Sequence, residues 1–126
     1  MKKYRDKWRL FLVEGKRLCR EALNSGWKIE KAFLREDFSL DSDSGLFGKI
    51  LSERKIPLRM LKPDDFRKLA DTENPQGIML IVHKPAPREM REWLAAKPRI
   101  LLVLDGIRDP GNMGTIIRSA DWFGVS

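Results

Sequence analysis

The chain has 126 residues, a net charge of +7, one cysteine and one histidine. Its hydrophobic content of 42% is enough for a core, and no run of about 18 apolar residues predicts a membrane span. A zinc site needs about four Cys, His or carboxylate ligands at close spacing, and this composition excludes a Cys/His set. One cysteine forms no internal disulfide, which indicates a reducing compartment and predicts a cytoplasmic location.

The excess positive charge is confined to the first quarter of the chain. Residues 1–35 hold 11 Lys or Arg against 4 Asp or Glu, whereas residues 36–126 hold 14 of each. Concentrated positive charge attracts a polyanion, and Tyr4 and Trp8 could stack on its bases. A solvated helix face would carry the same pattern, so the charge by itself does not decide between nucleic acid and solvent.

The first 83 residues are predicted to alternate strand and helix four times. Apolar runs with strand or helix spacing are separated by Gly, Pro and polar turns. Strands are expected at residues 11–14, 29–34, 57–61 and 78–82, and helices at 16–24, 46–55 and from Pro63 to 70. This alternation predicts an α/β fold, a sandwich with a largely parallel sheet.

The inner faces of these helices follow from apolar spacing. Three groups are expected to face the core: Leu18, Ala22 and Leu23; Leu46, Ile50 and Leu51; and Phe66, Leu69 and Ala70. Free cysteine is often buried, so Cys19 is predicted to be a packing residue in the core. His83 is predicted to be a plain strand-end residue, and Glu14 to bond the turn after the first strand.

A second region begins after a linker at residues 84–98, which contains a short helix at 88–97 with Met90, Trp93 and Leu94 on one side. Residues 100–104 form a continuous apolar run that predicts a central parallel strand. A loop is expected at 108–114, and then a helix at 115–123 with Ile116, Ile117, Ala120 and Phe123 inward. One strand and one helix cannot cover both faces of a sheet, so residues 99–126 are predicted to be an incomplete domain.

The sequence at 104–125, LDGIRDPGNMGTIIRSADWFGV, places a strand end, a glycine-rich loop and a helix start together. Ligands of open α/β sheets bind at the carboxyl ends of strands, and helix N-termini favour anions. Gly111 and Gly114 would allow close backbone approach, and Asn112 can donate and accept hydrogen bonds. A structural turn with Arg118 in solvent remains an alternative at this point.

This stretch resembles the first signature motif of the SpoU/TrmH family in the SPOUT superfamily of methyltransferases. The matching elements are Asn112-x-Gly114-x-x-x-Arg118, the preceding Leu104-Asp105, and Arg118-Ser119-Ala120. Residues 11–17 and 74–78 are similar to the family's N-terminal substrate-binding domain, which is itself similar to a small ribosomal RNA-binding protein. The resemblance implies domains at 1–83, an RNA substrate-binding domain, and at 99–126, the start of a knotted Rossmann-like SPOUT domain.

The resemblance also implies an activity: methyl transfer from S-adenosylmethionine to a ribose 2′-hydroxyl of rRNA or tRNA. Arg118 and Asn112 match the catalytic motif. An arginine can stabilise a developing alkoxide or orient the adjacent phosphate, while its high pKa argues against a general base. Asn112 would position the ribose or support the loop.

The family's later motifs build the cofactor pocket, and they are expected after Ser126. The 126-residue chain alone is therefore predicted neither to bind S-adenosylmethionine nor to methylate. Complete members of the family pair through the catalytic domain, which implies a homodimer. RNA is the expected partner, with no membrane contact. The predicted RNA contacts are Arg5, Lys7, Lys16, Arg17, Arg20, Asn74 and Gln76.

Two other function classes are alternatives for this sequence. A non-catalytic RNA-binding module would use the first region alone, but it would not need the motif at 104–125. A nucleotide-binding enzyme of another kind would carry a phosphate loop such as G-x-x-x-x-G-K-[ST] or G-x-G-x-x-G, which residues 111–114 do not match.

Overall fold

The computed structural model describes residues 7–40, 43–87, 89–95 and 100–125. The chain divides into two compact units, Met1–Pro85 and Ala86–Ser126. The first unit contains the strands β1 (Leu10–Glu14), β2 (Ile29–Arg35), β3 (Leu58–Leu61) and β4 (Ile78–His83). Its helices are α2 (Lys16–Asn24), the 3-10 helix η1 (Glu36–Leu40), α3 (Ser44–Glu53) and α4 (Pro63–Leu69). The predicted alternation of strands and helices in this unit is confirmed.

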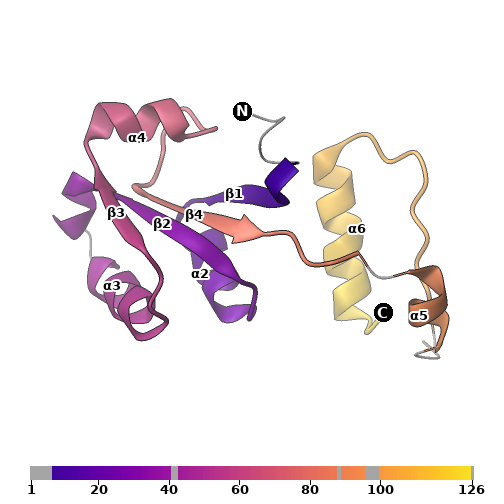
Figure 1. The fold of residues 1–126 in the computed structure, drawn as a ribbon. Helices are drawn as coiled ribbons and strands as arrows, with labels where there is room; N and C mark the ends of the chain where they lie inside the picture. The colour runs from indigo at the N-terminus through magenta and orange to yellow at the C-terminus, as the bar shows by residue number, and fades with distance from the viewer. Residues whose placement is uncertain (1–6, 41–42, 88, 96–99, 126) are drawn as a thin grey trace. The chain divides into compact units, whose positions relative to one another are not determined.

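The four strands form one mixed sheet in the order β1-β4-β2-β3. β2 and β3 are parallel, but β4 is antiparallel to both β1 and β2, so the prediction of a largely parallel sheet is wrong. The reason is local to the carboxyl end of β2, where the Arg35 amide donates to the Gly77 carbonyl at 2.9 Å. β3 ends at the same edge of the sheet as β2, and α4 with the loop after it does not carry the chain back to the opposite edge. β4 therefore starts at the carboxyl end of β2 and runs antiparallel to it, between β1 and β2 (Figure 1).

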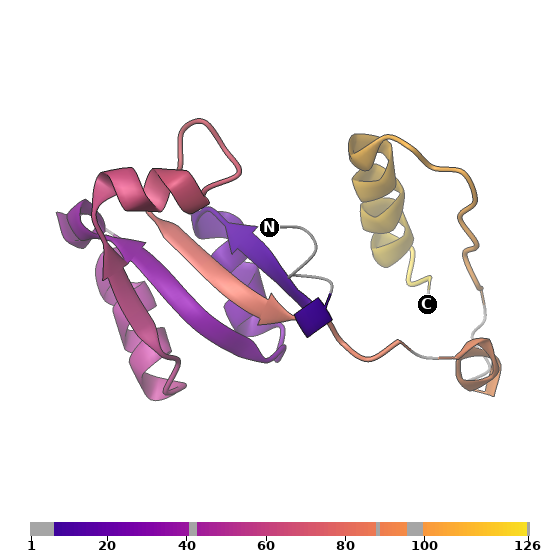
Figure 2. The same ribbon diagram turned by 45° about the horizontal axis from the view of Figure 1, so that its top comes forward.

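The sheet has helices on both faces. The main core lies between the sheet and the pair α2 and α3, whose buried side chains Cys19, Leu23, Phe47 and Leu51 cluster with alternate residues of β4. On the opposite face, α4 contributes Phe66, which is fully buried, as is Met79 of β4. Figure 2 shows α4 and the α2–α3 pair on opposite sides of the strands. β4 is therefore the central strand, apolar on both faces.

Two helix faces differ from the expectation by about one residue. Leu18 is 55% exposed and Leu46 is 46% exposed, while the neighbouring Cys19 and Phe47 are fully buried. The helix spacing alone allows either neighbour to face the sheet, because an apolar stripe covers a wide arc. Cys19 is confirmed as a packing residue, and its burial raises the pKa of the thiol to about 12.

The second unit contains α5 (Met90–Ala95) and α6 (Pro110–Trp122). The predicted strand at 100–104 is wrong, since these residues form no strand and are largely exposed. A strand needs a neighbour for its backbone hydrogen bonds, and no described strand pairs with this run. Nor do Met90, Trp93, Leu94, Ile117 and Phe123 face a core, because all are exposed.

No helix among the described residues is long and apolar enough to cross a membrane.

Candidate functional site

The start of α2 is joined to the loop before β4 by a backbone-to-side-chain hydrogen bond. The Lys16 amide donates to the Oε1 atom of Gln76 at 2.9 Å, across 60 residues of sequence. Gly15 precedes the helix with φ = 91°, and a Cβ atom there would lie 3.1 Å from the same oxygen. Glycine therefore satisfies both the left-handed backbone and the close approach. The contact places two predicted RNA-binding residues, Lys16 and Gln76, side by side.

The cations of α2 are arranged around Asp43 at the start of α3. Lys16 Nζ lies 3.5 Å and Arg20 Nη2 lies 3.2 Å from the two carboxylate oxygens of Asp43. Arg17 instead pairs with Glu21 at 3.2 Å along the helix, and its side chain is 86% exposed. Lys16 and Arg20 therefore share one carboxylate. Asp43 was not identified as a site residue from the sequence, because only tertiary structure brings it to α2.

An open hollow of about 510 Å³ lies beside this helix start. Its lining comprises one cation and two acids among mostly polar residues: Glu14, Gly15, Arg17, Leu18, Thr72, Glu73, Asn74 and Gln76. Asn74 and Arg17 are exposed there, so both can reach a ligand that enters from solvent. Three of the predicted RNA contacts therefore meet at one surface depression.

Glu14 fixes one wall of this hollow. Its Oε2 atom accepts from the Asp71 amide at 2.9 Å, and its Oε1 atom accepts from the Thr72 hydroxyl. Glu14 is structural as predicted, but it holds the loop before β4 rather than the turn after β1. A carboxylate with both oxygens bonded to one loop keeps that loop, including Asn74 and Gln76, close to α2.

Two predicted RNA contacts, Lys7 and Arg5, precede β1 in the sequence. Lys7 is exposed, with Nζ 5.6 Å from the centroid of the Trp8 ring. Arg5 lies outside the described residues.

His83 ends β4 as predicted, and its Nε2 atom lies 2.8 Å from Glu30 Oε2. That hydrogen bond is the main reason why the pKa of Glu30 lies below its usual value.

The predicted catalytic residues both lie on α6. Asp109 caps the helix by accepting from the Asn112 amide at 2.7 Å, and Pro110 occupies the first turn. The helix therefore begins at Pro110, and the loop predicted for residues 108–114 is wrong from Pro110 onward. Arg118 lies about two turns into the helix. It is exposed, and its Nη2 atom donates to Thr115 Oγ1 at 3.1 Å.

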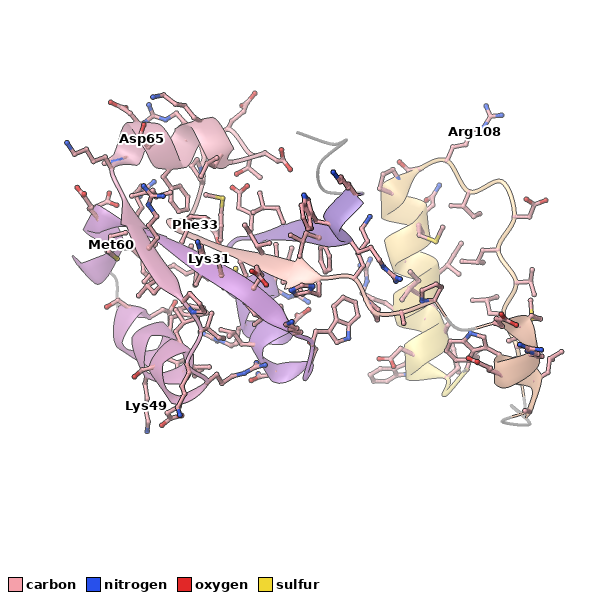
Figure 3. All side chains as sticks on the ribbon, viewed as in Figure 1. Lys31, Phe33, Lys49, Met60, Asp65 and Arg108 are labelled. Atoms are coloured by element: carbon pink, nitrogen blue, oxygen red, sulfur yellow. The ribbon has the colours of Figure 1, made fainter. Side chains whose placement is uncertain are left out.

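The hollow in the described part of the second unit does not fit S-adenosylmethionine. A hollow of about 380 Å³ is lined by Met90, Trp93 and the apolar run Leu101, Leu102, Val103 and Leu104. These side chains offer no charged group or amide for a sulfonium, an amino-acid head group or an adenine ring. Among the described residues no group of three or more His, Cys, Asp or Glu could hold a metal ion. Figure 3 shows Arg108, before α6, projecting away from the helix.

The fold and this surface define an α/β substrate-binding domain followed by a second unit. Residues 1–80 match the model of the MRM3-like substrate binding domain. The chain belongs to this family, the MRM3-like substrate-binding domains of TrmH/SpoU rRNA 2′-O-methyltransferases.

Named relatives align with nearly the whole chain. It is 36% identical over 124 residues to the 23S rRNA (guanosine(2553)-2′-O)-methyltransferase RlmP of Bacillus subtilis, covering 98% of this chain and 44% of the relative. It is 34% identical over 134 residues to the mitochondrial rRNA methyltransferase 3 of Mus musculus, covering 98% of this chain and 29% of the relative. The chain thus spans less than half the length of these relatives.

Solved structures agree with the fold. An rRNA methyltransferase from Sinorhizobium meliloti superposes with a TM-score of 0.73 at 29% identity, over 100% of this chain and 46% of that protein. The AdoMet-bound structure of an rRNA methyltransferase from the same organism gives a TM-score of 0.70 at 28% identity, over 100% of this chain and 45% of that one. The mixed four-stranded α/β domain is therefore shared with the N-terminal region of TrmH methyltransferases.

Proposed function

We propose that this chain recognises RNA for an enzyme that methylates a ribose 2′-hydroxyl of rRNA or tRNA. The observation that carries the proposal is the junction of α2 with the loop before β4. Lys16, Arg17 and Arg20 lie on one helix, and Asn74 and Gln76 lie on the loop bonded to its start. Cations can hold phosphates here while amides reach sugar and base edges.

Arg17 is the cation best placed to reach a phosphate. Its side chain is 86% exposed, and its partner Glu21 is itself 62% exposed. An exposed ion pair contributes only about 0–1 kcal/mol, so a phosphate can replace Glu21 at small cost. Lys16 and Arg20 would add a second phosphate contact by exchanging Asp43 for the ligand.

The finer features of the family belong to the same proposal. The first unit would be a ribosomal-protein-like α/β/α sandwich, and the second would be the start of a SPOUT domain. Arg118 would stabilise the developing alkoxide, and Asn112 would position the ribose. S-adenosylmethionine would supply the methyl group in the longer enzyme, which would act in the cytoplasm as a homodimer.

The test is a charge reversal with a matched control. Arg17→Glu places two acids four residues apart on α2, and Lys49→Glu does the same on α3, where Lys49 pairs with Glu53 at 3.9 Å. Figure 3 shows Lys49 projecting from α3 into solvent. Binding to a 23S rRNA transcript is measured by filter retention at a series of salt concentrations.

Arg17→Glu is expected to weaken binding about tenfold and to reduce the salt slope by about one, since one phosphate contact is lost. Lys49→Glu should leave both quantities close to those of the parent. Equal losses of affinity in the two variants would mean that the net charge of the chain, and not a contact at Arg17, controls RNA binding. An unchanged affinity for Arg17→Glu would reject this face of α2 as the RNA-binding surface.

A further inference from the structure

The side-chain amide of Gln76 has its orientation fixed by a backbone donor. The Lys16 N–H group only donates, so the Gln76 atom that lies 2.9 Å from it is the oxygen, Oε1. A Cβ atom at Gly15 would lie 3.1 Å from this oxygen and 3.7 Å from the amide carbon, so the oxygen is the end of the amide nearest to α2. The amide nitrogen, Nε2, therefore points away from the start of the helix.

Two side-chain amides at the hollow beside α2 have hydrogen-bonding groups to offer a ligand. Gln76 and Asn74 are both exposed and both line this hollow. Within the described ranges, neither Gln76 Nε2 nor the Asn74 amide bonds to another residue. Asn74 can turn its amide and either donate or accept, whereas Gln76 cannot turn without losing the bond from Lys16. Gln76 thus presents two N–H donors to the hollow and no alternative.

An acceptor for the same ligand lies on the same loop. Glu73 is exposed and lines the hollow, and its carboxylate only accepts hydrogen bonds. Glu14, the other acid of the lining, has its two oxygens bonded to Asp71 and Thr72. Glu73 is therefore the acid that can accept from a ligand, and the hollow combines a donor of fixed direction with an acceptor.

This combination matches one class of RNA base edge. Uracil and guanine carry a keto oxygen next to a ring N–H, whereas cytosine and adenine carry an amino group next to a ring nitrogen without a proton. A keto oxygen accepts from Gln76 Nε2, but an amino group would set N–H against N–H and leave both donors unsatisfied. Such an edge is free to be read only where the base is unpaired, in a loop, a bulge or a single strand.

We propose that Gln76 is a specificity-determining residue that selects uracil or guanine in an unpaired segment of RNA. Nε2 of Gln76 donates to the keto oxygen, Glu73 accepts from the neighbouring ring N–H, and Arg17 holds an adjacent phosphate. The inference rests on the proposed RNA-binding function and adds which bases the hollow accepts.

The test compares single-stranded oligouridine and oligocytidine of twelve nucleotides, with affinities measured by fluorescence anisotropy. Both probes carry the same phosphate charge, so the ratio of their affinities reports on the base edge. Gln76→Glu keeps an oxygen for the Lys16 amide and replaces the donor Nε2 with an acceptor. The parent chain is expected to bind oligouridine about tenfold more tightly, and Gln76→Glu should bring the ratio to one or below.

Asn24→Asp is the matched control. It makes the same change from amide to acid at the last residue of α2, which does not line the hollow. Its affinity ratio should equal that of the parent. In NMR spectra of the parent chain, the side-chain N–H signals of Gln76 should shift when oligouridine binds.

A ratio that Gln76→Glu leaves unchanged would overturn the proposal, as would a preference of the parent chain for oligocytidine. Arg17→Glu separates this result from the proposed function, because loss of a phosphate contact should weaken both probes alike. If Arg17→Glu does so while Gln76→Glu leaves the ratio unchanged, RNA binding at α2 stands and the base selection is rejected. Binding of neither probe by the parent chain would overturn both.

Discussion

Two apolar runs of similar composition have opposite structures in this chain. Residues 78–83, IMLIVH, form β4 at the centre of the sheet, with four of the six residues fully buried. Residues 100–104, ILLVL, form no strand, and Val103 is 71% exposed. Both runs satisfy the same sequence rule for a buried strand. The difference shows that neighbouring backbone, rather than side-chain hydrophobicity, decides whether such a run becomes a strand.

β4 has those neighbours on both sides. It pairs with β1 from Leu10↔His83 to Glu14↔Met79, and with β2 from Ile29↔Val82 to Leu34↔Ile78. Its alternate side chains then fill the cores beneath α2 and α4. The hydrogen-bonded ladder and the two cores support one another, so β4 is the element on which the first unit depends most.

The largest expected effect compares one leucine from each run. Leu80→Ala, at a fully buried site in β4, should lower the free energy of unfolding by about 2–5 kcal/mol, because it leaves a cavity. Leu102→Ala, at a site that is 43% exposed, should change it by no more than about 0.5 kcal/mol. Urea denaturation followed by circular dichroism measures both. Similar losses in the two variants would mean that the second run is buried as well.

The next effect depends on pH and concerns the thiol that lies against β4. Cys19 Sγ is 3.9 Å from the Ile78 carbonyl, and burial raises the pKa of this thiol from 9.0 to about 12. In the unfolded chain the thiol ionises above pH 9, whereas in the folded chain it stays protonated. Stability contributed by this group is thus complete below pH 9 and is lost as the pH rises from 9 toward 12.

The Cys19→Ala variant isolates this effect from other groups that titrate in the same range. The difference in unfolding free energy between parent and variant should be constant below pH 9 and should shift against the parent above it. A difference independent of pH up to 12 would show that the thiol ionises without unfolding, and that this side of β4 is open to water.

The smallest effect lies at the end of β4, where the sheet stops. His83 Nε2 lies 2.8 Å from Glu30 Oε2, and the hydrogen bond that the imidazole N–H donates to the carboxylate lowers the pKa of Glu30. Stability from this group is present above the usual pKa of 4.5 and is lost as the pH falls through the lower folded value. The effect on stability is small because Glu30 is exposed.

His83→Ala should return the pKa of Glu30 toward 4.5, as measured by NMR titration of the carboxyl carbon. Asp65 is the internal control, since its pKa is lowered by a separate hydrogen bond from Lys68 on α4. A shift at Asp65 of the same size would reveal a general change in the fold rather than the loss of one contact.

Some features of the candidate site depend on local sequence, and others depend on contacts between residues far apart in the chain. The cations of α2 and the amides at Asn74 and Gln76 could be identified from residue type, spacing and resemblance. Their meeting could not, because it depends on the bond from the Lys16 amide to Gln76 and on Glu14 holding Asp71 and Thr72. Asp43, which joins Lys16 to Arg20, gave no sequence signal that linked it to α2.

The sequence by itself determined the helices and strands of the first unit, since apolar spacing, glycine turns and Pro63 act over a few residues. It also determined the membership in the SpoU/TrmH family, through motifs at 11–17, 74–78 and 104–125. The direction of β4, the exposure of Leu18, and the absence of a strand at 100–104 were decided by tertiary structure alone. Each depends on which backbone lies alongside, and no local pattern contains that information.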